Sequence, residues 1–405
     1  MIDTAAPRHE KNEVFGKDMG MDESVASDER RPLLRIESLK THFFVDDGPV
    51  RAVDGVTLTV PRGKTVCIVG ESGCGKSITG RSVMGLVEHP GRVVDGHIWW
   101  SPADGDQRSS AGGRNPLRRS RRHAADSDQD AVDLAALDPR GEALRRIRGN
   151  EISMVFQEPM ASLSPMYTIA EQLIETIRLH RRMSKRDAYR LGVELLTRVG
   201  IPRAEQRMNA YSFQLSGGMC QRVMIAIAIA CGPKLLIADE PTTALDVTTQ
   251  ARIIDLLAEI QAETDMSMMF ITHDLGVVAQ IADEVVVMYL GTVVEQGSVE
   301  EIFHDPKHPY TRALLASIPK MGVGARKRPE TIRGQVPHPL NRPAGCPFHP
   351  RCDQAIAGVC DTSEPPTVEL PNGRRVRCVL YDRELVTTAA KGDQAVEATS
   401  GGTDE

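Results

Sequence analysis

The sequence predicts an α/β fold in which a mainly parallel sheet is flanked by helices. Short apolar runs rich in β-branched residues alternate with segments of helical periodicity. A glycine-rich turn joins one of these runs to a helix. Strand, helix and strand in this order are typical of parallel sheets with helices on their faces.

The individual elements follow from these patterns. Residues 64–69 (KTVCIV) are predicted to form a buried strand, and a helix is predicted from Lys76 after the glycine turn. Residues 235–239 (LLIAD) are predicted as another strand. Residues 267–274 and 284–291 are predicted as further strands. The helix after residue 239 carries apolar residues at helical spacing, namely Ile253, Leu256, Leu257 and Ile260.

Composition limits the class of protein. A chain of 405 residues with 41% hydrophobic content is globular and long enough for an enzyme. A net charge of −6 gives no reason to expect nucleic acid as a partner. The N-terminus lacks the apolar core of a signal peptide, and no apolar run reaches the roughly 18 residues that span a bilayer. We therefore expect a cytosolic chain whose eight cysteines do not form structural disulfides.

Polar segments indicate the domain boundaries. Residues 1–33 and 386–405 lack periodicity, so we expect them to be disordered. Residues 34–300 form the main domain, and residues 301–385 form a C-terminal extension. Residues 101–136 carry a basic block followed by an acidic one and predict a flexible surface insertion. A basic patch for nucleic acid or lipid is the alternative, but the acidic block would offset its field.

A phosphate-binding loop is predicted at residues 70–77. Their sequence, GESGCGKS, fits the pattern G-x-x-x-x-G-K-[ST] between a strand and a helix. Glycines let successive backbone N–H groups face phosphate oxygens, and the helix N-terminus adds its dipole. Lys76 would reach the β- and γ-phosphates, and the Ser77 hydroxyl would bind Mg²⁺. An ordinary tight glycine turn is the structural alternative.

Two acidic residues end the strand at residues 235–239. In parallel sheets the carboxyl ends of the strands are where phosphate ligands bind. Asp239 would hold Mg²⁺, directly or through water, and Glu240 would act as the general base toward the attacking water. Alone, this pair could equally be two solvated turn residues.

Further motifs follow in a fixed order. MVFQEP contains Gln157, LSGGMCQR covers residues 215–222, ALD ends at Asp246, and ITHD contains His273. With the two motifs above, they make residues 34–300 closely resemble the nucleotide-binding subunits of ATP-binding cassette transporters. The resemblance implies an antiparallel β subdomain, and a helical subdomain at residues 155–232 that carries the signature LSGGM. It also implies ATPase activity with MgATP as substrate.

The resemblance assigns roles to single residues. Glu240, His273, Gln157 and Lys76 would be catalytic, and Ser77, Gln157 and Asp239 would bind Mg²⁺. An aromatic residue ahead of the loop would stack on adenine; we prefer Phe43, although the adjacent Phe44 remains open. The ATP contacts would come from Phe43, Gly70, Glu71, Ser72, Gly73, Cys74, Gly75, Lys76, Ser77, Ile78, Ser216, Gly217, Gly218 and Asp246.

The signature contributes in trans, according to the resemblance. Ser216, Gly217 and Gly218 open a helix whose N–H groups suit an anion, although an ordinary serine N-cap would look the same. In the family this surface closes on ATP bound to a second cassette subunit, so the active form is a homo- or heterodimer. The preceding stretch YSFQ departs from the family, where a proline-histidine-glutamate-like stretch is usual.

The C-terminal extension resembles a subfamily. FHDPKHPYTRALLASIP, residues 303–319, and the later GCPFHPRC are similar to the tails of cassette subunits in oligopeptide, dipeptide and nickel importers. Four cysteines lie in a Pro- and Gly-rich segment that cannot fold on apolar burial alone, which favours a crosslinking centre. Four thiolates suit a [4Fe–4S] cluster or zinc, and the lack of close C-x2-C pairs favours the cluster; unliganded thiols are the alternative. These residues are Cys346, Cys352, Cys360 and Cys378.

The sequence thus predicts the ATPase subunit of an importer for di- or oligopeptides. Its partners would be a second cassette, a transmembrane permease and, indirectly, an extracellular solute-binding protein. The chain would lie at the cytoplasmic face of the membrane. Nickel or another small solute is an alternative cargo. A cassette protein of translation or DNA repair, or a redox-sensing Fe–S protein, fits the motifs less well.

Overall fold

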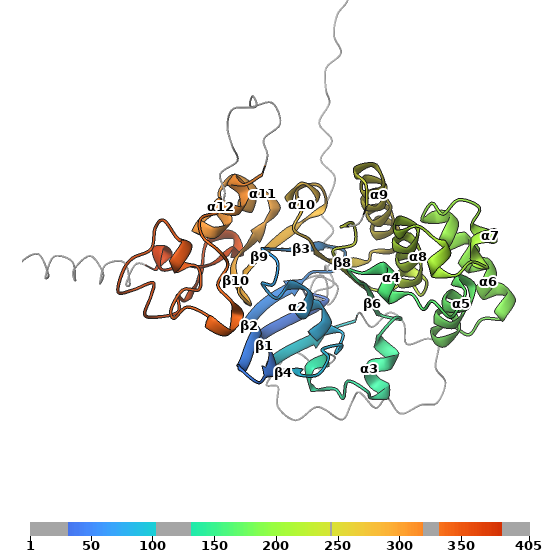
Figure 1. Ribbon diagram of the computed structural model, residues 1–405, viewed down its shortest axis with the longest axis horizontal. Helices are drawn as coiled ribbons and strands as arrows, with labels where there is room; N and C mark the ends of the chain where they lie inside the picture. Colours follow the sequence, from blue (N-terminus) through green and yellow to red (C-terminus); the bar gives the residue numbers. More distant parts are fainter. Residues whose placement is uncertain (1–30, 103–130, 244, 319–331, 383–405) are drawn as a thin grey trace, which may run out of the picture. The chain divides into compact units, whose positions relative to one another are not determined.

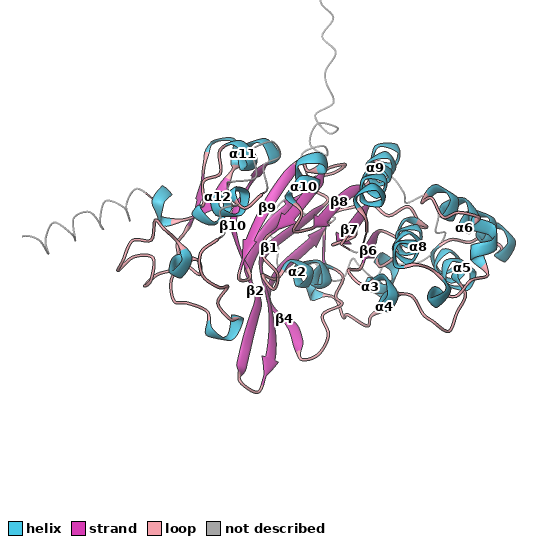
Figure 2. Cartoon of the chain, turned by 45° about the horizontal axis from the view of Figure 1, so that its top comes forward, coloured by secondary structure: helices cyan, strands magenta, loops and turns pink. Residues whose placement is uncertain are grey.

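The computed structural model describes residues 31–102, 131–243, 245–318 and 332–382. Two sheets and their surrounding helices make up this part of the chain (Figures 1 and 2). The larger sheet has eight strands in the order β11-β12-β10-β9-β3-β8-β7-β6, and the smaller has four in the order β2-β1-β4-β5.

Parallel strands form one side of the larger sheet, as far as its edge at β6. Every residue of β3, β8, β7 and β6 is buried, because helices and the second sheet cover both faces. This double cover explains why these segments are continuous apolar runs. The predicted mainly parallel sheet is therefore confirmed. The parallel strands, in spatial order, are β9 (Glu284–Tyr289), β3 (Thr65–Val69), β8 (Ser267–Ile271), β7 (Leu235–Asp239) and β6 (Ile152–Val155).

The C-terminal extension completes the other edge of this sheet. β10 (Thr292–Ser298) pairs antiparallel with β9 and with β12 (Arg375–Arg377), and β11 (Thr367–Glu369) pairs with β12. The extension is thus hydrogen-bonded to the sheet of the main domain.

The smaller sheet is antiparallel throughout. Its inward-facing residues join those of β3 and β7 in one apolar core between the two sheets. The predicted antiparallel subdomain is therefore confirmed. The strands are β1 (Leu34–Val45), β2 (Gly48–Val60), β4 (Gly91–Trp100) and β5 (Val132–Asp133).

The helices fall into groups with different roles. α2, α9 and α10 follow strands of the larger sheet, and α4 to α8 gather beside β6 (Figure 1). No described helix combines the length and apolar composition needed to cross a membrane. The helices are α2 (Lys76–Val83), α3 (Glu142–Ile147), α4 (Pro159–Ser162), α5 (Ile169–His180), α6 (Lys185–Arg198), α7 (Ala204–Met208), α8 (Gly217–Ile229), α9 (Val247–Thr264), α10 (Leu275–Ile281), α11 (Val299–His304) and α12 (Pro309–Ala316).

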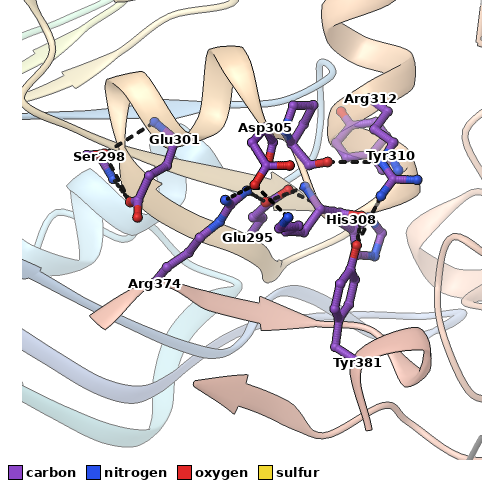
Figure 3. A network of polar contacts seen from close by, with 11 residues as sticks. Glu295, Ser298, Glu301, Asp305, His308, Tyr310, Arg312, Arg374 and Tyr381 are labelled. Atoms are coloured by element: carbon purple, nitrogen blue, oxygen red, sulfur yellow. Dashed lines mark hydrogen bonds and ion pairs between the residues drawn. The ribbon is translucent and has the colours of Figure 1, made fainter. Parts of the chain in front are cut away.

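A buried polar network fastens the extension to β10 (Figure 3). The Glu295 carboxylate is inaccessible to solvent and accepts the N–H groups of Lys307 and His308 at 2.8 and 2.9 Å. It also accepts a hydrogen bond from the buried Arg374 guanidinium, which binds the Asp305 carbonyl as well. One carboxylate therefore joins β10, the chain ahead of α12 and the start of β12.

Two boundaries differ from the expectations. Leu33, placed in a disordered segment, is 2% exposed and donates its N–H to the Val60 carbonyl. Residues 132–136, placed in the flexible insertion, form β5 and a short 3-10 helix with buried Leu134. These elements are too short to produce a periodic pattern. Residues 1–30, 103–130 and 386–405 lie outside the described residues.

Candidate nucleotide-binding site

The phosphate loop joins β3 to α2, and glycine is required where it turns. Gly70 and Gly75 have φ of +152° and +98°. A Cβ at Gly70 would lie 2.2 Å from the Met288 carbonyl oxygen, and one at Gly75 would lie 2.1 Å from that of Ala52. The loop therefore fits against β9 and β2 only with glycine at these positions.

The Lys76 ammonium group lies inside this loop. Its Nζ donates to the carbonyl oxygens of Gly70 at 2.8 Å and Glu71 at 3.1 Å. Lys76 also begins α2, so the ammonium and the free N–H groups of the helix concentrate positive charge in one place. Phosphate oxygens can replace the two carbonyls as acceptors. Of the other predicted loop contacts, Ser72 and Gly73 are exposed, Cys74 is buried and Ile78 is partly buried.

Ser77 and Asp239 meet at the end of β7. Ser77 Oγ donates to Asp239 Oδ1 at 2.7 Å, and Asp239 is 1% exposed. Burial raises the pKa of Asp239, although the Ser77 hydrogen bond acts in the opposite direction. A cation beside this carboxylate would relieve the cost of its burial. A hydroxyl and a carboxylate are hard oxygen ligands that Mg²⁺ prefers, so the pair fits the metal.

Glu240 is the centre of a polar cluster at the ends of β6, β7 and β8. Gln157 Nε2 and Thr243 Oγ1 donate to its Oε2 at 3.1 and 3.0 Å. His273 Nδ1 lies 3.3 Å from Oε1. The structure thus brings together Glu240, Gln157 and His273, which the sequence predicted for one site. The sequence analysis did not predict Thr243 as part of this site. Its position three residues after Glu240 was the signal that could have indicated it.

The backbone aims Glu240 at this cluster. Glu240 has φ of +46°, and its N–H donates to the Ile271 carbonyl of β8 at 2.9 Å. A positive φ is energetically costly for any residue other than glycine, and such backbone strain is concentrated at functional sites. The strand therefore ends with Asp239 buried and Glu240 turned toward the next strand.

The signature lies at the start of the buried helix α8, in a different part of the subunit from the phosphate loop. Ser216 caps α8 by accepting the Met219 N–H at 3.3 Å, and Gly217 is exposed. α8 packs against α4, α5, α6 and β6, whereas the loop lies at α2 (Figure 1). Asp246 caps α9 through Thr249, and these hydrogen bonds lower its pKa. Ser216 and Gly217 are therefore exposed at the surface of this subunit.

Two aromatic residues precede the site at the end of β1. Phe43 is half-buried, with its ring against Gly91. Phe44 is 44% exposed, and the Arg92 guanidinium carbon lies 4.5 Å from its ring centroid. Stacking of Phe43 on adenine remains a prediction.

The four C-terminal cysteines line one cavity. Its wall includes all four, with His308, Phe348 and His349. Burial raises the pKa of Cys352 to about 11 and that of Cys378 to about 12, and neighbouring cysteines add to both shifts. In the described part of the chain, no three Cys, His, Asp or Glu side chains form a closed metal-ligand group. The cavity brings the four cysteines to one place in the fold.

These features define a class of protein. A phosphate loop between a parallel strand and a helix, beside an acid pair on a neighbouring strand, is the site of a P-loop nucleotide hydrolase. The added antiparallel sheet and the signature-bearing helices make it an ATP-binding cassette. Residues 53–243 match the ABC transporter family model, and residues 294–360 match the C-terminal region of oligopeptide/dipeptide transporters. The chain belongs to the ABC transporter family.

Curated relatives match over most of their length. The oligopeptide transport ATP-binding protein AppD of Bacillus subtilis is 46% identical over 87% of this chain and 98% of its own. The dipeptide transport ATP-binding protein DppD of Escherichia coli is 42% identical over 85% of this chain and 96% of its own length. The predicted resemblance to the peptide-transporter subfamily is therefore confirmed.

Solved cassettes share the fold. A dimeric post-hydrolysis ATP-binding cassette bound to ADP and phosphate has a TM-score of 0.53 and 24% identity. A dimeric bacterial ABC transporter cassette has a TM-score of 0.54 and 25% identity. Each match spans 66% of this chain and 98% of the solved chain. The predicted cassette fold is confirmed.

Proposed function

We propose that this chain hydrolyses MgATP to drive the uptake of di- or oligopeptides through a separate permease. The cluster around Glu240 carries the hydrolytic part of the proposal. The names of the curated relatives and the match of residues 294–360 support the peptide cargo. Nickel or another small solute remains the alternative cargo, because cargo choice lies in other subunits.

We propose that Glu240 is the general base, and its hydrogen bonds support this role. Gln157 and Thr243 both donate to Oε2, so Oε1 is left to accept a proton from the attacking water. His273 lies beside Oε1 and can orient that water and contact the γ-phosphate.

The nucleotide itself would be held by the phosphate loop. Lys76 would bind the β- and γ-phosphates, while Ser77 and Asp239 would hold Mg²⁺, with Gln157 nearby. When bound, Mg²⁺ neutralises phosphate charge and orients the reacting groups. Residues 70–77 supply the N–H groups around the phosphates.

The active form is proposed to be a dimer of cassette subunits. The exposed Ser216 and Gly217 would cover the γ-phosphate held by a partner subunit, together with Asp246. The rings of Tyr211 and Phe213 stack at 5.4 Å just ahead of the signature and are 37% and 63% exposed. Their position makes them part of the proposed dimer face.

The permease would dock near Gln157 at the cytoplasmic face of the membrane. Met160, Met166 and Tyr167 follow Gln157 in the chain and are 50%, 78% and 57% exposed. Large apolar side chains at this level of exposure are typical of protein interfaces. A contact beside Gln157 would couple docking to the hydrolytic site.

Peptide uptake tests the cargo. Cells that lack the native gene would receive the wild-type chain or the Glu240→Gln variant, and uptake of labelled di- and oligopeptides would be measured. The proposal expects uptake only with wild type. ATP hydrolysis by the purified chain without any gain in peptide uptake would refute the cargo and keep the ATPase.

We also propose that the four cysteines hold a [4Fe–4S] cluster, with zinc as the alternative. A single zinc ion needs all four sulfurs about 2.3 Å from one point, whereas a cluster spreads its ligands further apart. The cavity that all four cysteines line supports a common centre, and the cysteine spacing, which lacks close C-x2-C pairs, favours the cluster. The turn at Gly345 helps to bring two of the cysteines together, because Cys346 donates its N–H to the Cys360 carbonyl at 2.8 Å.

Metal analysis tests this centre. Protein purified without air would be assayed for iron, sulfide and zinc, beside Cys346→Ser and the matched control Cys231→Ser. Iron and sulfide that are lost only in Cys346→Ser are the expected result. Zinc in their place would establish the alternative, and the absence of both would refute a metal centre.

A further inference from the structure

Glu71, the second residue of the phosphate loop, is held by the C-terminal extension. Its carboxylate binds the Arg351 guanidinium, with NH1 to Oε2 at 2.7 Å and NH2 to Oε1 at 3.0 Å. Its backbone N–H donates to the Tyr310 hydroxyl at 2.9 Å. Two residues that lie far from the loop in sequence therefore fix both its side chain and its backbone.

Arg351 is itself held rigidly. Besides Glu71, its guanidinium donates to the carbonyl oxygens of Arg333 and Gly334 and to the Tyr289 hydroxyl. All five N–H groups of the guanidinium thus have an acceptor. The side chain is only 4% exposed. A guanidinium fixed in this way presents two parallel N–H donors to a carboxylate, a geometry that lysine cannot reproduce.

Tyr310 is fixed by aromatic packing. Its ring is inaccessible to solvent, with the ring centroids of Tyr289 and Phe348 at 4.8 and 5.3 Å. Phe348 also lies 5.9 Å from the Arg351 guanidinium carbon. The two residues that contact Glu71 therefore belong to one packed unit of β9, α12 and the cysteine-bearing segment.

These contacts bear on nucleotide binding because the Glu71 carbonyl oxygen also accepts a hydrogen bond from the Lys76 ammonium group. When Lys76 turns to phosphate, Arg351 and Tyr310 remain to keep the start of the loop in place. Arg351 also neutralises a carboxylate that would otherwise repel a triphosphate. We propose that Arg351 and Tyr310 are positioning residues for the phosphate loop, acting through Glu71. This inference rests on the proposed binding of ATP to the loop and is independent of the cargo.

The test measures nucleotide affinity separately from turnover. The full-length chain would be titrated with a fluorescent ATP analogue and Mg²⁺, and ATPase rates would be measured as a function of ATP. Tyr310→Phe and Arg351→Gln are each expected to raise Kd and KM about tenfold, as the loss of a charge-assisted or buried hydrogen bond predicts. The kcat should stay within about twofold, because neither residue touches the Glu240 cluster. Arg351→Lys should give an intermediate Kd.

A matched control separates positioning from general stability. Arg377→Gln removes another arginine of the extension, whose hydrogen-bond partners are Glu364 and Pro365 instead of Glu71. It should leave Kd unchanged. Adding Arg351→Gln to Glu71→Gln should cause little further loss, because Arg351 acts through that carboxylate.

Two results would overturn the inference. One is a lower melting temperature in Arg351→Gln and Tyr310→Phe with Kd and KM at wild-type values. The other is an equal loss of affinity in Arg377→Gln. Tyr310→Phe and Arg351→Lys preserve side-chain volume, so the test holds even if Arg351→Gln does not fold. Peptide uptake can fail while these affinity differences persist, which keeps the two proposals distinguishable.

Discussion

Single residues at the ends of parallel strands carry the proposed chemistry. Asp239 and Glu240 are adjacent, yet one is buried beside Ser77 and the other faces Gln157, Thr243 and His273. The positive φ of Glu240 produces this division. Two carboxylates in different environments can hold a metal and accept a proton without competing for one role.

Replacement of Glu240 by glutamine should abolish hydrolysis while keeping binding. An amide cannot accept the proton of the attacking water, so kcat should fall at least about 100-fold. Affinity for MgATP should persist, because Lys76 and Ser77 are unchanged. Steady-state ATPase assays and nucleotide titration would measure both. Glu259→Gln, at an exposed position on α9, is the control; a kcat in Glu240→Gln within tenfold of wild type would contradict the assignment.

His308 should make the protein sensitive to acid. Burial lowers its pKa from 6.5 to about 3, and its Nδ1 accepts the Tyr310 N–H. Because the folded pKa is depressed, protonation of the unfolded chain costs stability as the pH falls from 6.5 toward 3. The cost is about 1.4 kcal/mol per pH unit in this window.

The variant His308→Asn tests that cost. Asparagine keeps an acceptor at the N-cap but does not titrate. Urea unfolding at several pH values should show wild type losing stability relative to His308→Asn between pH 6.5 and 4. Parallel curves for the two proteins would show that His308 is not the titrating group.

At the scale of elements, buried polar groups decide which segments join. Glu295 of β10 binds Arg374, the residue before β12, and the N–H groups of Lys307 and His308 (Figure 3). The parallel strands are held together without such groups, because their backbone hydrogen bonds and buried apolar faces stabilise the sheet. The extension has short strands and irregular chain, so its attachment depends on this network.

Glu295→Ala should therefore destabilise the protein strongly. It leaves two buried backbone N–H groups without an acceptor and leaves the buried Arg374 guanidinium with Asp305 alone, which costs about 3 kcal/mol. The free energy of unfolding from urea titration would measure the loss. Glu300→Ala, at an exposed position in the first turn of α11, should change it by less than about 0.5 kcal/mol. Equal effects of the two variants would show that the network contributes little.

At the scale of the whole molecule, the exposed Ser216 and Gly217 of the signature predict that the subunit forms a dimer when ATP binds. In the Glu240→Gln background, MgATP should convert the chain from monomer to dimer, as measured by light scattering after size exclusion. Adding Gly217→Glu should block this step, because it sets a negative charge against the partner's γ-phosphate. A Cβ at Gly217 meets no atom within 4 Å, so the subunit should still fold.

A control variant keeps this prediction specific. Ala258→Glu adds the same charge at an exposed position on α9 and should leave dimer formation intact. A dimer that persists in Gly217→Glu would place the interface elsewhere.

Local patterns in the sequence predicted the parallel strands and the phosphate loop, whereas the family resemblance supplied the antiparallel and helical subdomains and the roles of Gln157 and His273. The strands at 64–69 and 235–239 are buried apolar runs, and residues 70–77 fit a continuous motif. Such features are set by neighbouring residues, because periodicity, glycine turns and helix starts are local. The order of the motifs then indicated which strand ends would meet.

Only the tertiary structure decided the long-range contacts. Arg351 and Glu71 are separated by 280 residues in sequence. No periodicity or spacing encodes such a pair, since it arises when β9, α12 and the extension pack around one aromatic cluster. The same holds for Glu295 with Arg374, and for the cavity that gathers the four cysteines. The sequence by itself determined the chemistry of the phosphate loop; the packing of the extension decided what holds that loop in place, because burial and ion pairing depend on elements that meet only in the folded chain.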